Sequence, residues 1–127
     1  SEIKLDEKFT LVHIGLVNAD RNPKVLLKVL SELISENKSF AKDFQLTFVG
    51  KLADEVIQNI AENNLEPHIK MVNYLPHNDV VNFRKKAQVL LLLVNNVPSA
   101  KMSVWNEAMF YFQLADKKYK KLLNNVF

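Results

Sequence analysis

The sequence contains no cysteine, which excludes a disulfide framework and any thiol-based metal or redox site. Long apolar runs are also missing: no stretch approaches the roughly 18 residues of a membrane-spanning helix, and no signal-peptide pattern is present. Charge of one sign does not dominate, because 17 basic residues face 14 acidic ones. Four lysines cluster at Lys117, Lys118, Lys120 and Lys121, and without them the chain is nearly neutral. A chain-wide nucleic-acid-binding face is therefore not expected.

Glycine is scarce. The chain has only two, Gly15 and Gly50, and each directly follows an apolar run that predicts a strand. Glycine is most useful where a side chain would obstruct the backbone or a ligand. Because the two glycines stand at equivalent points of successive units, we interpret them as markers of a ligand-binding edge, with simple strand-ending turns as the alternative.

Several motifs of nucleotide binding and catalysis are absent. The sequence has no G-x-G-x-x-G after the first strand, no P-loop and no G-x-S-x-G nucleophile elbow. His13, His68 and His77 lack the spacing of metal ligands, so no zinc site is expected. A hydrogen-bonded core position explains His13, and a helix start explains His77, without catalysis.

The apolar residues that are present predict strands alternating with helices. The runs that predict strands are Phe9–Ile14, Phe44–Val49, Ile69–Tyr74 and Val89–Val94. Helical spacing predicts helices over residues 23–36, 52–64, 77–87 and 104–127, with Asn22 capping the first and a polar connection at 37–43. This α/β alternation predicts one domain over residues 9–127, after a loose lead-in at 1–8, with helices on both faces of a parallel sheet of about four strands.

The last predicted helix is long and amphipathic. It would bury Trp105, Phe112 and Tyr119 and leave the four clustered lysines in water. Its middle contains helix formers and neither glycine nor proline, so we expect it to continue without a break. An acidic partner or an anionic lipid surface is the alternative explanation of the lysines.

The stretch Phe9–Glu36 is the most informative unit. It reads as a strand, a glycine, a polar loop and a capped helix. Ligands of parallel α/β sheets bind beyond the carboxyl ends of the strands, and a helix that starts there directs free N–H groups toward anions. The unit therefore predicts an anion or nucleotide site.

Four blocks of the sequence carry a resemblance to a known family: Ile14–Pro23, Leu46–Lys51, Asn64–His77 and Ala87–Val94. In their order and spacing they resemble the C-terminal, donor-binding domain of retaining two-domain glycosyltransferases (group 1 type), which serve bacterial capsule and lipopolysaccharide assembly. The resemblance covers about Phe9 to Lys101. It implies a Rossmann-like three-layer α/β/α fold and a nucleotide sugar as donor substrate, with no metal and no separate cofactor.

The resemblance also implies a set of donor-binding residues: Gly15, Asn18, Arg21, Gly50, Lys51, Tyr74, Leu75 and Glu107. Arg21 would neutralise the diphosphate, a solvated loop arginine being the alternative. Tyr74 and Leu75 would lie along the base, with a half-buried strand-end aromatic as the alternative for Tyr74. Glu107 would bind the ribose hydroxyls, although another register places Phe110 there and leaves no acid. No catalytic residue is assigned.

The sequence departs from the family at several points. Leu16 stands where the family often has a second basic residue, and Ser99 stands where it has an earlier glutamate. The family turns into another strand near Gln113, whereas we expect no fifth strand here, and we expect the family's N-terminal acceptor domain to be missing. The implied protein is a truncated, cytoplasmic transferase fragment, inactive alone, that could contact the inner membrane face or self-associate. A non-catalytic Rossmann-like binding or interaction module is the alternative.

Overall fold

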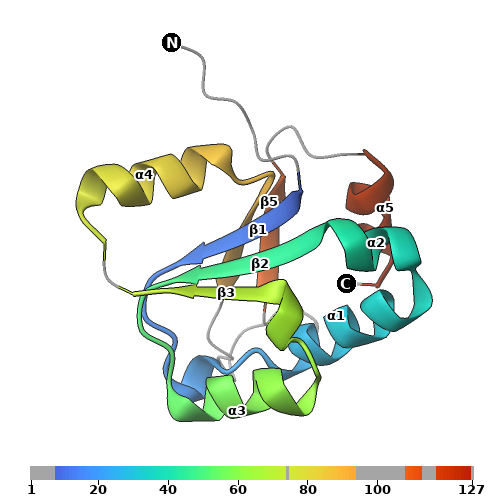
Figure 1. The fold of residues 1–127 in the computed structure, drawn as a ribbon, viewed down its shortest axis with the longest axis horizontal. Coiled ribbons are helices and arrows are strands. Elements are labelled where there is room, and N and C mark those ends of the chain that lie inside the picture. The colour runs from blue at the N-terminus through green and yellow to red at the C-terminus, as the bar shows by residue number, and fades with distance from the viewer. Residues whose placement is uncertain (1–7, 74, 94–107, 113–116, 127) are drawn as a thin grey trace, which may run out of the picture.

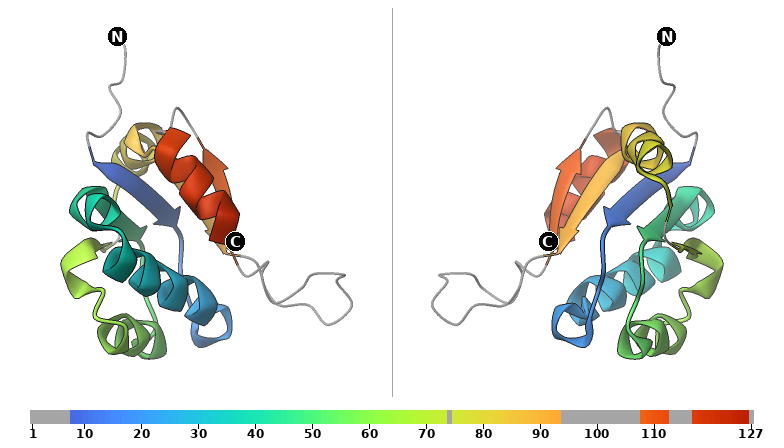
Figure 2. Two further views of the ribbon diagram at one scale, coloured as in Figure 1. Left: turned by 90° about the vertical axis from the view of Figure 1, so that its right-hand side faces the viewer. Right: turned by 90° about the vertical axis from the view of Figure 1, so that its left-hand side faces the viewer.

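The computed structural model describes residues 8–73, 75–93, 108–112 and 117–126 (Figure 1). They form a five-stranded sheet in the order β3-β2-β1-β4-β5. Four of its strands are parallel: β1 (Phe9–Ile14), β2 (Phe44–Val49), β3 (Ile69–Val72) and β4 (Val89–Leu93). The fifth, β5 (Ala108–Phe112), runs antiparallel to β4 at the sheet edge, as Figure 2 shows.

Helices cover both faces of the sheet. They are α1 (Lys24–Glu36), α2 (Lys38–Asp43), α3 (Asp54–Glu62), α4 (His77–Lys86) and α5 (Lys117–Val126), with short 3-10 turns η1 (Ala19–Arg21) and η2 (Glu66–His68). Figure 1 shows α4 on one side of the sheet and α1 and α3 on the other. The predicted three-layer, Rossmann-like α/β fold is confirmed. None of the helices in the described ranges is long and apolar enough to cross a membrane.

Successive side chains of β1 point to opposite faces of the sheet, and apolar residues on each face are covered by helices. Phe9 and Leu11 pack into the main core with α1, whereas Val12 belongs to a second apolar cluster under α4. The main core is rich in rings: Phe40 stacks on Phe44 at 4.8 Å, and Tyr119 of α5 lies 5.0 Å from Phe9, measured between ring centroids. Burial of each such side chain contributes about 1.5–3 kcal/mol, so these contacts fix α2 and α5 against the sheet.

The prediction of one helix over residues 104–127 is wrong, and so is the expectation of no fifth strand. β5 occupies Ala108–Phe112, and α5 begins only at Lys117. Large apolar and aromatic residues suit a strand as well as a helix face, and pairing with β4 gives their backbone a full ladder of hydrogen bonds. Tyr119 is buried and Lys120 and Lys121 are exposed, as expected. Trp105 and the side chains of Phe112, Lys117 and Lys118 lie outside the described residues.

The polar connection predicted at residues 37–43 is also wrong, because it contains α2. The side-chain oxygen of Asn37 accepts a hydrogen bond from the backbone N–H of Phe40 at 2.9 Å, which caps the helix. Phe40 is fully buried in the main core. The sequence does indicate this helix: Asn37 suits an N-cap, and the apolar Phe40 follows three residues later. The helix is too short for apolar periodicity to show it.

Candidate functional site

The two glycines lie side by side at the carboxyl edge of the sheet. Gly15 follows β1, Gly50 follows β2, and their φ angles are +124° and +127°, values that L side chains rarely adopt. A Cβ atom on Gly50 would lie 2.8 Å from the carbonyl oxygen of Gly15. Close approach of the two backbones therefore requires glycine at position 50.

Gly15 is required for its backbone conformation alone. Among the residues that the structure describes, a Cβ atom there would meet only the His13 ring, at 4.0 Å. The N–H of Gly15 donates to the carbonyl of Val49 and the N–H of Gly50 donates to that of Val72, each at 2.8 Å. Both donors are thus used inside the sheet, and the glycines shape the edge instead of presenting N–H groups to a ligand.

The loops after the two glycines run together. The N–H of Val17 donates to the carbonyl of Lys51 at 3.0 Å, and the N–H of Ala53 donates to that of Val17 at 2.8 Å. Val17 is fully buried, whereas Lys51 is exposed and Leu16 keeps 57% of its surface in contact with solvent. The loop after β1 is therefore anchored at Val17, with its polar part displayed beyond it.

Three asparagines fix the far end of this loop. The side-chain oxygen of Asn22 accepts from Asn59 at 3.1 Å, and the side-chain oxygen of Asn59 accepts from Asn63 at 2.8 Å. The prediction that Asn22 caps α1 is wrong: Pro23 is the N-cap residue, and the side chain of Asn22 bonds α3 instead. Sequence periodicity cannot reveal the bond between Asn22 and Asn59, because these residues are 37 positions apart in the sequence.

The N-terminus of α1 completes the carboxyl edge. No side chain in the described parts of the protein caps this helix, whose first residue is Lys24. The first N–H groups of an α-helix lack intrahelical partners and attract anions. In α1 the N–H of Lys24 donates to the carbonyl of Asn22 at 2.9 Å, so the anion would meet the N–H groups that follow it. Immediately before α1, η1 places Arg21 in the chain, while the Arg21 side chain lies outside the described residues. Asn18 precedes η1 and is exposed.

An apolar cavity lies on the other side of β1. The strand order reverses between β1 and β4, and ligands of open α/β sheets bind at such a point. There, a cavity of about 250 Å³ lies between α4 and the carboxyl-terminal parts of β1 and β4. Its lining is Val12, Ile14, His77, Val80, Val81, Arg84, Leu90, Leu91 and Leu92. Pockets for drug-sized ligands span about 300–1,000 Å³, so this one suits a single ring system such as a nucleobase.

The structure brings together some predicted donor-binding residues and separates others. Gly15, Gly50 and Lys51 meet at one edge. Leu75 is half-buried under α4, on the opposite face from α1. Tyr74 and Glu107 lie outside the described residues. Sequence reasoning did not select Arg84 and His77 of α4, although both line the cavity at the strand reversal.

The histidines fit structural roles. His13 is buried with its ring 5.9 Å from that of Phe48, as expected for a core residue. His77 begins α4, as predicted, although Pro76 occupies the N-cap position.

No protein-family model matches this chain, and no curated protein matches it either. The fold class is a Rossmann-like α/β domain with four parallel strands and an antiparallel edge strand.

Proposed function

We propose that this domain binds a nucleoside diphosphate at its carboxyl edge, as the donor-binding part of a glycosyltransferase of cell-surface polysaccharide synthesis. The observation that carries the proposal is the meeting of Gly15 and Gly50 at the ends of adjacent parallel strands, in front of the connection that leads from β1 to α1. The resemblance of the sequence blocks supplies the donor class, a nucleotide sugar.

Each part of the ligand has a matching surface. The diphosphate lies by the N-terminus of α1, and we assign its neutralisation to Arg21, which belongs to η1, and to the exposed Lys51. The base enters the apolar cavity between Ile14 and His77.

In the proposed reaction, this domain binds the donor and stabilises the leaving group. In sugar transfer, the bond between the sugar and the diphosphate breaks while an acceptor hydroxyl attacks the sugar. Positioning of the donor and neutralisation of the leaving diphosphate supply the acceleration on this side of the reaction. The acceptor would lie on the separate domain that the resemblance implies, so we expect this chain alone to bind donor without turnover.

A titration followed by amide NMR tests the proposal. UDP and GDP should shift the amide signals of residues 15–18 and 50–52, and inorganic diphosphate should shift the same loops more weakly. Uridine alone should shift signals near Ile14 and His77 instead. If millimolar UDP and GDP leave the two glycine loops unchanged, the domain is not a donor-binding domain.

A second candidate is a non-catalytic interaction module, and the exposed apolar residues of the same edge favour it. Ile14, Leu16 and Leu92 keep 37%, 57% and 54% of their surfaces exposed. Ile14 and Leu92 line the same cavity, and contiguous exposed apolar surface marks protein–protein contacts. Concentration-dependent sedimentation that Leu16→Glu abolishes, without nucleotide binding by the parent, would favour this candidate over the first.

A further inference from the structure

A second, larger cavity lies on the α4 face of the sheet, over the amino-terminal halves of the strands. Its volume is about 660 Å³. We call it the sheet groove, and its lining is Lys8, Thr10, Val12, Gln45, Thr47, Lys70, Leu75, Asp79, Asn82, Phe83 and Lys86. It lies away from Gly15 and Gly50, which follow the carboxyl ends of the same strands.

The floor of the sheet groove is polar in a position where a sheet is usually apolar. Thr10 of β1 pairs in register with Gln45 of β2, and Thr47 of β2 pairs with Lys70 of β3. Partners in a parallel ladder point to the same face, so these four side chains form one polar surface. On the same face but nearer the carboxyl ends, α4 covers an apolar cluster that includes Val12, Val49 and Val72.

The two threonines of the floor are buried, and a buried polar side chain needs a reason beyond packing. Thr10 and Thr47 keep only 5% and 4% of their surfaces exposed. Valine has nearly the same shape and avoids the cost of burying a hydroxyl. The Thr10 hydroxyl accepts from the backbone N–H of Gln88 at 3.4 Å, which gives it a structural role. Thr47 contributes its side chain to the groove floor.

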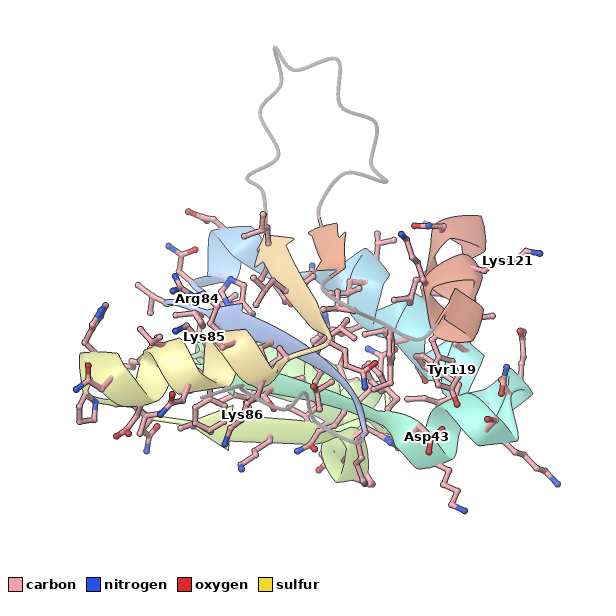
Figure 3. The ribbon with its side chains drawn as sticks, turned by 90° about the horizontal axis from the view of Figure 1, so that it is seen from above. Asp43, Arg84, Lys85, Lys86, Tyr119 and Lys121 are labelled. Carbon is pink, nitrogen blue, oxygen red and sulfur yellow. The ribbon has the colours of Figure 1, made fainter. Side chains whose placement is uncertain are left out.

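Charge around the sheet groove is mostly positive. Lys8, Lys70 and Lys86 line it against one carboxylate, Asp79, and all four residues are exposed. The Lys70 ammonium lies 5.6 Å from the centre of the Phe83 ring, so charge and an aromatic wall stand together. In Figure 3, Lys86 and Arg84 lie on opposite sides of α4, and only Lys86 borders this groove. A concave surface lined by one sign of charge concentrates ligands of the other sign.

We propose that the sheet groove binds a small organic anion, a phosphate monoester that carries a ring. The lysines hold the phosphate, the polar floor donates hydrogen bonds to it, and Phe83 with Val12 contacts the ring. The sheet groove shares Val12 with the apolar cavity proposed for the base, but it uses neither the glycine turns nor the N-terminus of α1.

Phenyl phosphate is a suitable probe, with phenol and inorganic phosphate as its two halves. Titration of the 127-residue chain, followed by amide NMR, should shift Thr47, Lys70 and the last turn of α4, and should leave Gly15 and Gly50 unchanged. Phenol and inorganic phosphate should each bind more weakly than the intact probe. Absence of shifts in the groove with millimolar phenyl phosphate overturns the proposal.

Two neighbouring lysines provide a matched pair of variants. Lys86→Glu should weaken phenyl phosphate binding about ten-fold or more, as expected when one charge-assisted contact is lost. Lys85→Glu makes the same charge change one residue earlier on α4, at an exposed position outside the groove, and should change binding less than about two-fold. Equal weakening by both variants means that general charge, not the groove, holds the anion, and overturns the proposal.

A substitution that changes no charge tests whether the floor of the sheet groove takes part in binding. Thr47→Val removes only the hydroxyl oxygen in exchange for a methyl group, and an unchanged spectrum elsewhere in the chain verifies that the fold is kept. It should weaken phenyl phosphate binding several-fold without changing the binding of UDP at the carboxyl edge. Unchanged phenyl phosphate binding in Thr47→Val shows that the floor is not part of a site.

Discussion

Gly50 and Gly15 are in backbone contact: a Cβ atom on Gly50 would lie 2.8 Å from the carbonyl oxygen of Gly15, whereas a Cβ atom on Gly15 would meet nothing closer than 4.0 Å. The two residues share the same unusual φ, so their substitutions differ mainly in this contact. Their comparison separates backbone strain from steric exclusion.

Gly50→Ala should therefore destabilise the domain more than Gly15→Ala. Each substitution forces an L residue into an unfavourable backbone conformation, which costs of the order of 1–3 kcal/mol. Gly50→Ala adds an overlap with a backbone atom that cannot move without disturbing β1. Urea unfolding of both variants measures the difference, and equal losses would show that the two strands' ends can separate freely.

Tyr119 holds α5 against α2 through its hydroxyl. The hydroxyl lies 2.6 Å from Oδ2 of Asp43, to which it donates, and Ser39 is also within hydrogen-bonding distance (Figure 3). Tyr119→Phe keeps the ring contacts with Phe9 and Phe40 and removes the hydroxyl, so it should cost about 1–2 kcal/mol, near the lower end for a bond to a charged group.

Lys121→Ala is the control for Tyr119→Phe. Lys121 is exposed on the same helix, and its removal should change the free energy of unfolding by about 0.5 kcal/mol or less. Denaturant unfolding of the two variants side by side makes the comparison. A Tyr119→Phe variant as stable as the parent would contradict the assigned role of the Asp43 contact.

The pair Asn22 and Asn59 should be energetically coupled. Asn59 donates to the side-chain oxygen of Asn22 at 3.1 Å, in a partly buried position. A double-mutant cycle of the two alanine variants should give a coupling of about 0.5–1.5 kcal/mol, the usual net contribution of one hydrogen bond. The exposed Gln58 on the same helix should show no coupling to Asn22. A coupling of zero in the first cycle means that α3 does not hold the loop after β1.

The parallel part of the fold was predictable from the sequence because its signals are local. The apolar runs Phe9–Ile14 and Phe44–Val49 are each followed by a glycine, and then by apolar residues at helical spacing. The antiparallel β5 was not predictable in this way. Ala108 and Phe112 have helical spacing and also fall on one face of a strand, so only the pairing with β4 decides between the two.

The site was predictable only in part. Scarcity of glycine indicated that Gly15 and Gly50 matter, and they do meet, but the local pattern could not show that a side chain at position 50 would overlap the backbone of Gly15. Asn22 has the chemistry of an N-cap, yet a long-range bond to Asn59 takes its side chain elsewhere. The sheet groove depends on the register of three strands, which no single segment encodes.

The most direct test of the central claim is calorimetric titration of UDP into the parent chain and its Arg21 variants. Arg21→Ala should lose roughly 1.5–3 kcal/mol of binding free energy, the range for a hydrogen bond to a charged group. Arg21→Lys should recover part of the loss, because the charge remains while the bidentate geometry does not. Lys28→Ala, at an exposed position further along α1, should bind as the parent does. Thermal melts should show all three variants folded. UDP binding by Arg21→Ala that equals binding by the parent would contradict a diphosphate site at this edge of the sheet.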